Sequence, residues 1–489
     1  MACKGKRCGK GPGYPTPMWA YENGPREKLL YVTTIQPNLE NEQGDYLSAV
    51  DVDPESETYS QVIHREYAGK SGQEFHHIGW NTCSSCFFVD SECTDVPVRD
   101  KLVLPCLISD SVYIFDVGQD PKRPKLHKII DGEVLRKNNC SAPHTSHCLP
   151  SGNVMISTMG DKDGNSKGEF VLLDGTTFEF TGTWTVGETA IGGYDYWYQP
   201  YFNVMCSSEW GAPKLWRRGF HPDDVKSEVD YGRRINVYAW NERKLIDTIH
   251  LGDEGIAPLE IRFMHDPKRC EGFVGTALFA KVFRFYKKNP SDEKFTVEKV
   301  IDVPSKKVDG WILPEMNGLM TDIILSLDDR FIYFSCWFHG DVRQYDISDP
   351  ANPKLVGQVF LGGLILNDSG IKVIEDTELT EQPSPVEIKG RRLCGGPQML
   401  QLSLDGKRLY VSSSLFSPWD KQFYPDMVKN GGTIVQLDVD TVNGGMKINE
   451  NFLVDFGKEP NGPSLPHEMR YPGGDCSSDI WLVEEDEEK

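Results

Sequence analysis

The sequence contains no long apolar run. Nowhere in its 489 residues does a stretch approach the roughly 18 apolar residues that a membrane-spanning helix needs. The N-terminus is basic and lacks the apolar segment of a secretory signal. We therefore expect a protein of the cytoplasm, and also of the nucleus, without stable membrane insertion. Its 13 cysteines should be mostly reduced thiols in those compartments.

Positive charge is also scarce. Lys and Arg number 52 against 73 Asp and Glu, a formal net charge of −21. The phosphate backbone of a nucleic acid would be repelled by such a chain. Nucleic acid is therefore not an expected partner.

Long amphipathic helices are nearly absent, and short apolar strands bounded by Asp, Gly, Asn and Pro take their place. The strands recur in groups of four. Residues 320–361, for example, hold four apolar segments separated by turns such as Asp328-Asp-Arg and His339-Gly-Asp. The pattern returns about seven times at a period of roughly 45–60 residues, which is typical of a β-propeller.

The repeat predicts an all-β fold, a seven-bladed β-propeller of four-stranded blades whose ring is closed by strands from both termini. Residues 26–483 would form the propeller, residues 1–25 a flexible N-terminal arm containing cysteines, and residues 484–489 an acidic tail. A pair of β-sandwiches is the competing architecture. Trp419-Asp420 is the sole Trp-Asp pair of the sequence, which disfavours WD40 repeats.

Six of the 11 histidines fall at one mouth of the predicted channel. They open inner strands or occupy turns of different blades: His76, His77, His144, His147, His339 and His467. Imidazole suits copper, zinc, iron and nickel, so the set predicts a transition-metal site. Glu468, Asp341 or Glu209 could orient the rings. The alternative is that each histidine caps a strand or bonds a buried carbonyl. Because neighbours on a strand point to opposite faces, only one of His76 and His77 should face the axis.

Cys83 and Cys86 form a lone CxxC motif. Such a pair can bind a soft metal, cycle between dithiol and disulfide, or carry selenium or a thiol adduct. A complete zinc site needs two further ligands, and none lies nearby in the sequence. Two inert turn thiols are the open alternative. Roughly 20 Å of extended chain separates the motif from His76 and His77, so we expect it to lie away from the histidines.

Six segments carry a specific resemblance to one family, and the match runs almost end to end. They are Gly-Trp-Asn-Thr-Cys-Ser-Ser-Cys at 79–86, His-Thr-Ser-His at 144–147, Gly-Tyr-Asp-Tyr-Trp-Tyr-Gln-Pro at 193–200, Leu-Glu-Ile-Arg-Phe at 259–263, Asp-Val-Arg-Gln-Tyr-Asp-Ile-Ser-Asp-Pro at 341–350 and Arg-Tyr-Pro-Gly-Gly-Asp-Cys-Ser-Ser-Asp at 470–479. Here the chain resembles the selenium-binding protein family, also called methanethiol oxidase. The resemblance implies a seven-bladed propeller and a copper-dependent oxidase that converts methanethiol, O₂ and water to formaldehyde, hydrogen sulfide and hydrogen peroxide.

Residues in this sequence are assigned to that chemistry as follows. Copper should be held by the set His77, His144, His147, His339 and His467, with His76 in reserve. Glu468 and Asp341 should orient ligands or relay protons as catalytic groups. The resemblance also implies bound selenium, on a cysteine that vertebrate members carry where this chain has Ser60, so selenium here would need Cys83 or Cys86. The competing function is a non-catalytic selenium or thiol carrier, or a scaffold in intracellular protein transport that binds protein partners on its propeller faces.

Overall fold

A computed structural model describes residues 11–87, 97–289 and 292–483 of the chain. Within these residues almost all regular structure is β, in nine antiparallel sheets, seven of which have four strands. The expected all-β class is therefore confirmed. Residues 1–10, with Cys3 and Cys8, and the expected acidic tail at 484–489 lie outside the described residues.

Each four-stranded sheet except one consists of consecutive strands. In order, these six sheets are β4 (Gly79–Trp80), β5 (Lys101–Pro105), β6 (Val112–Asp116), β7 (Lys125–Ile130); β8 (Ser141–Cys148), β9 (Asn153–Gly160), β10 (Ser166–Asp174), β11 (Phe180–Thr183); β12 (Tyr196–Gln199), β13 (Val204–Ser207), β14 (Arg234–Ala239), β15 (Lys244–His250); β16 (Pro258–Phe263), β17 (Glu271–Thr276), β18 (Lys281–Tyr286), β19 (Thr296–Asp302); β22 (Met320–Leu325), β23 (Phe331–Cys336), β24 (Asp341–Asp346), β25 (Lys354–Phe360); and β29 (Leu400–Leu402), β30 (Arg408–Ser412), β31 (Thr433–Val439), β32 (Met446–Asp455). The four strands expected within residues 320–361 are thus all present, because Asp- and Gly-rich turns separate the apolar segments.

The remaining four-stranded sheet joins both ends of the chain. Its order is β3 (Gln61–Tyr67), β2 (Tyr46–Asp51), β1 (Leu29–Ile35) and β33 (Leu465–Arg470). β33 runs antiparallel to β1, with Val32 opposite Met469, and the register shifts between Val32 and Thr34. Two short sheets lie outside the seven, formed by β20 (Lys306–Asp309), β21 (Glu315–Met316) and β26 (Lys372–Glu375), and by β27 (Glu387–Ile388) and β28 (Arg391–Arg392).

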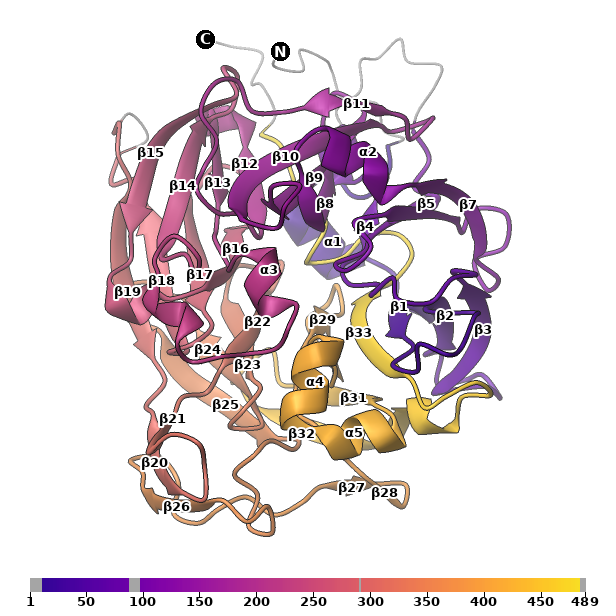
Figure 1. The fold of residues 1–489 in the computed structure, drawn as a ribbon, viewed down its shortest axis with the longest axis vertical. Helices are drawn as coiled ribbons and strands as arrows, with labels where there is room; N and C mark the ends of the chain where they lie inside the picture. Colours follow the sequence, from indigo (N-terminus) through magenta and orange to yellow (C-terminus); the bar gives the residue numbers. More distant parts are fainter. Residues whose placement is uncertain (1–10, 88–96, 290–291, 484–489) are drawn as a thin grey trace.

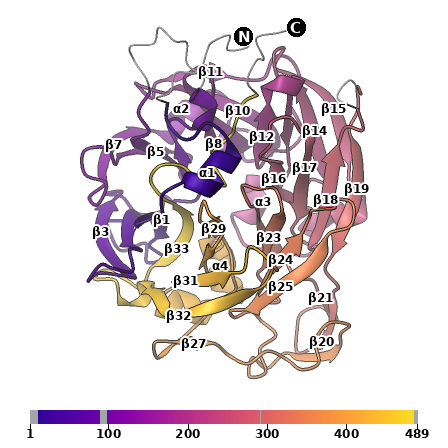
Figure 2. The same ribbon diagram turned by 180° about the vertical axis from the view of Figure 1, so that it is seen from behind.

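The four-stranded sheets follow one another around a central region (Figures 1 and 2). In the six sheets of consecutive strands the first strand lies nearest the centre and the last lies at the rim, whereas in the seventh β33 lies nearest the centre and β3 lies at the rim. The residue pattern explains this order. β16 and β22 are buried at every position, whereas β15 alternates between exposed and half-buried residues. A strand packed on both faces must be apolar or internally bonded throughout, and an outer strand needs only one such face.

Five short helices decorate the sheets. They are α1 (Pro17–Asn23), α2 (Gly132–Lys137), α3 (Pro213–Trp216), α4 (Ser417–Phe423) and α5 (Pro425–Asn430), counted over the described residues. None of the helices placed in the structure is long and apolar enough to cross a membrane. α1 lies within residues 1–25, where we expected a flexible arm. Ala20 is fully buried in it, Thr16 caps its first turn, and the backbone N–H of Tyr14 donates to Ser84 Oγ at 3.0 Å.

Candidate metal centre

Four histidines from separate parts of the chain meet near the centre of the molecule. His76 and His77 precede β4, His144 lies in β8, and His467 lies in β33. Both His76 and His77 point into the group, contrary to the expectation for a strand. The reason is local: Phe75 makes only an isolated bridge and β4 starts at Gly79, so no regular strand alternation applies between them.

The four rings are packed against one another. Ligand nitrogens of His76, His77 and His144 all lie within 4.8 Å of each other. The ring centroids of His77 and His144 are 3.9 Å apart. The ring of His467 stacks on His76 at 3.7 Å with an interplanar angle of 21°. We call these four residues the histidine cluster.

Each ring of the histidine cluster has a buried nitrogen with no hydrogen-bond partner among the described residues. These atoms are His76 Nδ1, His77 Nε2, His144 Nε2 and His467 Nε2. The opposite nitrogens have partners in two rings. His467 Nδ1 donates to the carbonyl of Ser414 at 2.8 Å, and His144 Nδ1 lies 3.0 Å from Thr145 Oγ1. Because buried polar atoms are normally satisfied, four unpaired nitrogens in one group of packed rings indicate a missing partner.

The imidazoles are held in their neutral form. Burial lowers the pKa of His467 and of His144 to about 3, and it lowers the pKa of His76 and of His77 well below the usual value. The neighbouring imidazoles add to this shift at His76 and His77. A neutral ring keeps a lone pair on one nitrogen, which is what a metal ligand requires.

Two buried carboxylates flank His77. Glu468 Oε1 is 3.6 Å from His77 Nδ1, and Glu260 Oε1 is 3.7 Å from His77 Nε2. Arg470 donates to Glu468 at 2.7 Å, and Arg262 donates to Glu260 at 2.6 Å. Burial raises the pKa of Glu468 to about 7 despite Arg470. Burial and then Asp195 raise the pKa of Glu260 well above its usual range.

A small apolar pocket of about 30 Å³ adjoins the histidine cluster. His76 and His144 form part of its wall, and aromatic and aliphatic side chains form the rest: Leu107, Met159, Tyr194, Trp210, Trp216, Leu415, Phe416 and Trp419. α3 and α4 provide its cover, since Trp419 Nε1 donates to the carbonyl of Trp216 at 3.1 Å. The Tyr194 ring lies 3.8 Å from that of His144.

The structure does not bring His147 or His339 into the histidine cluster. His147 lies further along β8, with its ring 5.2 Å from both Tyr196 and Trp197. A register shift between Pro143 and Ser146 changes the strand alternation between His144 and His147. His339 Nε2 donates to the carbonyl of Met316 at 3.0 Å instead. The alternative of a histidine that bonds a buried carbonyl therefore describes His339.

Asp341 also has partners of a different kind. Its Oδ2 accepts from Arg343 Nε at 2.7 Å and from Gln358 Nε2 at 2.6 Å. Arg343 in turn bonds both carboxylate oxygens of Glu378, at 2.7 and 2.8 Å. We call Asp341, Arg343 and Glu378 the arginine cluster. Its geometry is that of a buried ion-pair network, and Glu209 is similarly bound to Arg234 at 2.7 Å.

Cys83 and Cys86 lie in another buried group, with Cys148 at the end of β8 as their third member. The thiol of Cys148 donates to Cys83 Sγ at 2.6 Å. We call these three residues the thiol cluster. Ser60 is not a member of the thiol cluster. Its hydroxyl oxygen accepts a hydrogen bond from Lys389 Nζ at 3.0 Å.

Sequence reasoning missed Glu260, Cys148 and the aromatic pocket. Two of these had a signal: Glu260 lies in the segment at 259–263 that carries the family resemblance, and Cys148 directly follows His147. The pocket had none, because its walls come from seven stretches that are far apart in the sequence.

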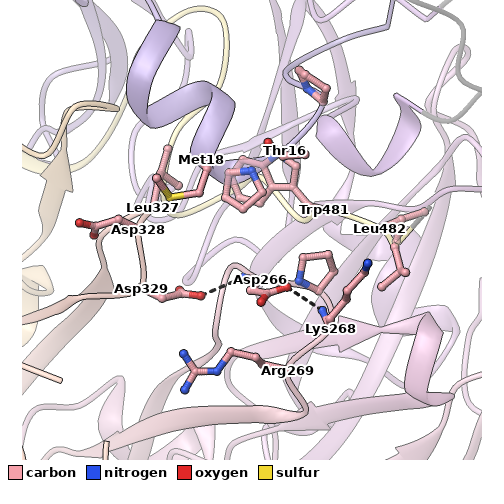
Figure 3. A pocket seen from close by; sticks show the side chains of 14 residues that line it. Thr16, Met18, Asp266, Lys268, Arg269, Leu327, Asp328, Asp329, Trp481 and Leu482 are labelled. Carbon is pink, nitrogen blue, oxygen red and sulfur yellow. Dashed lines mark hydrogen bonds between the residues drawn. The ribbon is translucent and has the colours of Figure 1, made fainter. Parts of the chain in front are cut away.

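A larger pocket of about 480 Å³ lies elsewhere and includes none of the four histidines (Figure 3). Thr16 and Met18 of the α1 region face Asp266, Arg269 and Trp481 across it. Asp329 anchors its wall by accepting from the Asp266 N–H at 2.9 Å. The pocket holds no convergent metal-ligating group among its lining residues.

Known proteins resemble this chain over almost its whole length. A family model described as 56 kDa selenium-binding protein matches residues 8–482. A methanethiol oxidase of Xenopus tropicalis is 58% identical over 97% of this chain and 100% of the relative. Selenium-binding protein 2 of Mus musculus is 57% identical over 99% of this chain and 100% of the relative. A solved structure, a hypothetical selenium-binding protein of Sulfolobus tokodaii, aligns with a TM-score of 0.86 at 35% identity, over 97% of this chain and 100% of the other. The chain therefore belongs to the 56 kDa selenium-binding protein family.

Proposed function

We propose that this protein is a copper-dependent methanethiol oxidase. It would convert methanethiol, O₂ and water to formaldehyde, hydrogen sulfide and hydrogen peroxide. Relatives of 57–58% identity that bear the name methanethiol oxidase support the proposal. The histidine cluster and its apolar pocket support it independently.

The proposal includes the architecture of the whole chain. The seven four-stranded sheets would be the blades of a seven-bladed β-propeller. The pairing of β33 with β1 would close the ring, because it completes a blade with a strand from each end of the chain. The histidine cluster would then lie on the propeller axis.

The residues present fit a copper ion. The orphaned nitrogens of His76, His77, His144 and His467 are neutral and buried, so each can donate a lone pair. Imidazole is a good copper ligand, and the ion also accepts the soft sulfur of a thiolate. Copper would supply the capacity to bind the substrate sulfur and to pass electrons to O₂.

The pocket selects the substrate by size and polarity. Methanethiol has a single methyl group and no charge, which suits a cavity of about 30 Å³ walled by Trp, Phe, Leu and Met side chains. His76 and His144 are the polar side of that cavity. A thiol with its methyl group against the aromatic wall would therefore turn its sulfur toward the histidine cluster.

The carboxylates beside His77 would orient its ring as a metal ligand and would take up or release the thiol proton. Glu468 lies within 3.6 Å of Nδ1 and Glu260 within 3.7 Å of Nε2, so both can orient the ring. Glu468 also accepts the backbone N–H of Ile78, which fixes its position beside His77. A carboxyl with a pKa of about 7 can take up or release a proton near neutral pH, as the thiol proton requires. This assignment keeps Glu468 as a catalytic candidate and replaces Asp341 by Glu260.

The observation that carries the proposal is the set of four orphaned nitrogens beside an apolar pocket. The test is elemental analysis for copper and selenium on the purified full chain, combined with release of sulfide and hydrogen peroxide from methanethiol. We expect bound copper and both products. A protein that carries no copper after copper loading and releases neither product would refute the oxidase and favour the carrier or the scaffold.

A further inference from the structure

The thiol cluster is a second buried group of reactive side chains, and the proposed function does not use it. Cys83 and Cys148 are 1% exposed and Cys86 is 5% exposed. Cys148 lies between the other two thiols. It donates to Cys83 Sγ at 2.6 Å, and it also bonds the side chain of Cys86.

The surrounding residues fix the three sulfur atoms in place. Ser85 Oγ lies 3.2 Å from Cys83 Sγ, 3.6 Å from Cys148 Sγ and 3.9 Å from Cys86 Sγ. The Tyr198 hydroxyl donates to the carbonyl of Cys148 at 2.6 Å and contacts Ser85 Oγ at 3.1 Å. Asp479 accepts from both the N–H and the hydroxyl of Ser84. The cluster is therefore preorganised across two neighbouring sheets.

The three thiols differ in reactivity. The hydrogen bond with Cys148 lowers the pKa of Cys86 to about 6, which outweighs the opposing effect of burial. Burial raises the pKa of Cys148 well above its usual range. At neutral pH Cys86 is therefore the thiolate of the group, and the thiolate is the form that attacks an oxidant.

Access to the cluster favours a small oxidant. Cys86 Sγ lies 3.4 Å from the carbonyl oxygen of Leu149, and Leu149 also lines a cavity of about 470 Å³. Trp184, Trp240 and Leu482 form other parts of that cavity wall. A protein disulfide cannot reach sulfurs buried this deeply, whereas hydrogen peroxide is little larger than water.

We propose that the thiol cluster is a peroxide-oxidised site in which Cys86 reacts first and a disulfide between Cys83 and Cys148 is the product. The Cys86 thiolate attacks H₂O₂, which breaks the O–O bond and yields a sulfenic acid and hydroxide. Cys148 then attacks the sulfur of Cys86, forms a disulfide and releases water. Cys83 attacks the sulfur of Cys148 and restores the Cys86 thiolate. In total, two thiols and one H₂O₂ give one disulfide and two molecules of water.

The proposed oxidase reaction would release H₂O₂ in the same molecule, but the inference needs only peroxide. The test supplies peroxide directly and uses no methanethiol. Failure of the oxidase proposal would therefore leave this inference intact, and the reverse also holds.

The test is peptide mapping of the full-length protein. Reduced wild-type protein is freed of reductant, treated with a small excess of H₂O₂, alkylated and digested without reduction. We expect most of Cys148 to appear in a peptide joined to the Cys83 peptide. Reduced thiols at all three positions, or a link between Cys83 and Cys86 in its place, would overturn the proposal.

Two variants test the order of events. Cys86→Ser should form the same link at least about tenfold more slowly, because the reactive thiolate is gone. Cys206→Ser is the matched control, since it removes another buried thiol, in β13, and should leave the rate unchanged. An unchanged rate in Cys86→Ser would refute the role of Cys86. Wild-type protein alone decides whether the link forms, so the result does not depend on how the variants fold.

Thermal unfolding provides a second measurement. The link would enclose a loop between residues 65 positions apart. Oxidised wild-type protein should therefore unfold at a higher temperature than the reduced protein, and Cys148→Ser, which lacks the cysteine shared by the intermediate and the final link, should not show this rise. A lower unfolding temperature after oxidation would contradict the proposed link.

Discussion

The histidine cluster and the arginine cluster both have carboxylates close to histidines: Glu260 and Glu468 flank His77, and Asp341 is two residues from His339. The two groups differ in how their polar atoms are satisfied. In the arginine cluster the guanidinium of Arg343 bonds Asp341 and both oxygens of Glu378. Burial pushes the pKa of Glu378 upward, but Arg343 outweighs it and the pKa is lowered. In the histidine cluster burial prevails, and four ring nitrogens have no partner among the described residues.

The difference separates a structural network from a ligand site. Arg343 bonds Asp341 Oδ2 and both oxygens of Glu378, so removing Arg343 would leave the buried Asp341 charge uncompensated. Neutral groups with unused lone pairs lower the stability of the empty protein, so their convergence indicates a bound partner. Burial and histidine content alone do not distinguish the two regions.

The largest expected difference is between two histidine substitutions, one in the histidine cluster and one near the arginine cluster. His467→Gln should lose bound copper and reduce methanethiol turnover by more than the roughly 10–100-fold typical of residues behind a metal ligand. His339→Gln is the matched control and should keep its copper, because His339 lies outside the histidine cluster and bonds the Met316 carbonyl. Copper content and sulfide release measure both variants. Equal copper loss in His339→Gln would erase the distinction between the regions.

Removing the central charge of the arginine cluster should affect stability instead. Arg343→Met removes the cation that pairs with the buried Asp341 carboxylate and should cost about 3–5 kcal/mol of unfolding free energy, measured by urea denaturation. Copper content of the folded protein should not change. Arg392→Met removes a half-exposed pair with Asp368 and should cost less than about 1 kcal/mol. A large loss of copper in folded Arg343→Met would contradict a purely structural role.

The pocket beside the histidine cluster should set substrate size. Met159→Ala enlarges it, and we expect kcat/KM for ethanethiol to rise about tenfold relative to methanethiol, since one methylene is worth about that much in an apolar pocket. Met205→Ala, a fully buried methionine of β13 outside the pocket, is the control and should leave the ratio unchanged. The same change of ratio in both variants would show that the pocket does not select the thiol.

The smallest effect concerns Asp420 in α4, which covers the pocket. It accepts from Ser414 Oγ at 2.6 Å and from the Leu415 N–H at 3.0 Å, and burial raises its pKa to about 7. The folded protein therefore holds a proton that the unfolded chain releases at lower pH. This contribution to stability is present below about pH 4 and is lost as the pH rises through about 7.

Asp420→Asn cannot ionise, so it removes that dependence. The unfolding temperature of the wild type should fall relative to the variant between about pH 4 and pH 7. Thermal scans at several pH values measure the difference. Parallel curves for the two proteins would show that Asp420 is ionised in the folded state.

Local sequence patterns were sufficient to predict the strands. Turns such as Asp328-Asp-Arg end one apolar segment and start the next, so β22, β23, β24 and β25 could be read directly from residues 320–361. The helices were harder, because α3 and α4 have only four and seven residues and no full amphipathic period.

The site was only partly accessible from sequence. The order of the strands alone predicts that the first residues of the inner strands lie at the same end of the molecule. That prediction placed His77, His144 and His467 in one set. Which neighbours face the centre depends on backbone detail. His147 lies three residues beyond His144 in β8 and contacts Tyr196 and Trp197 instead, and the irregular backbone before β4 lets His76 join His77. Glu260 lies beside His77, and Cys148 beside Cys83, only in the folded structure. No local sequence pattern predicts these contacts.

The pairing of β33 with β1 has a consequence for biosynthesis. His467 belongs to the last strand and stacks on His76, so the ring contact joins positions 391 residues apart in translation order. A ribosome that has made the first six sheets has not yet made the fourth imidazole. Nascent and prematurely terminated chains therefore lack the complete histidine cluster, and a copper ion held by all four rings would be bound only after release of the finished polypeptide.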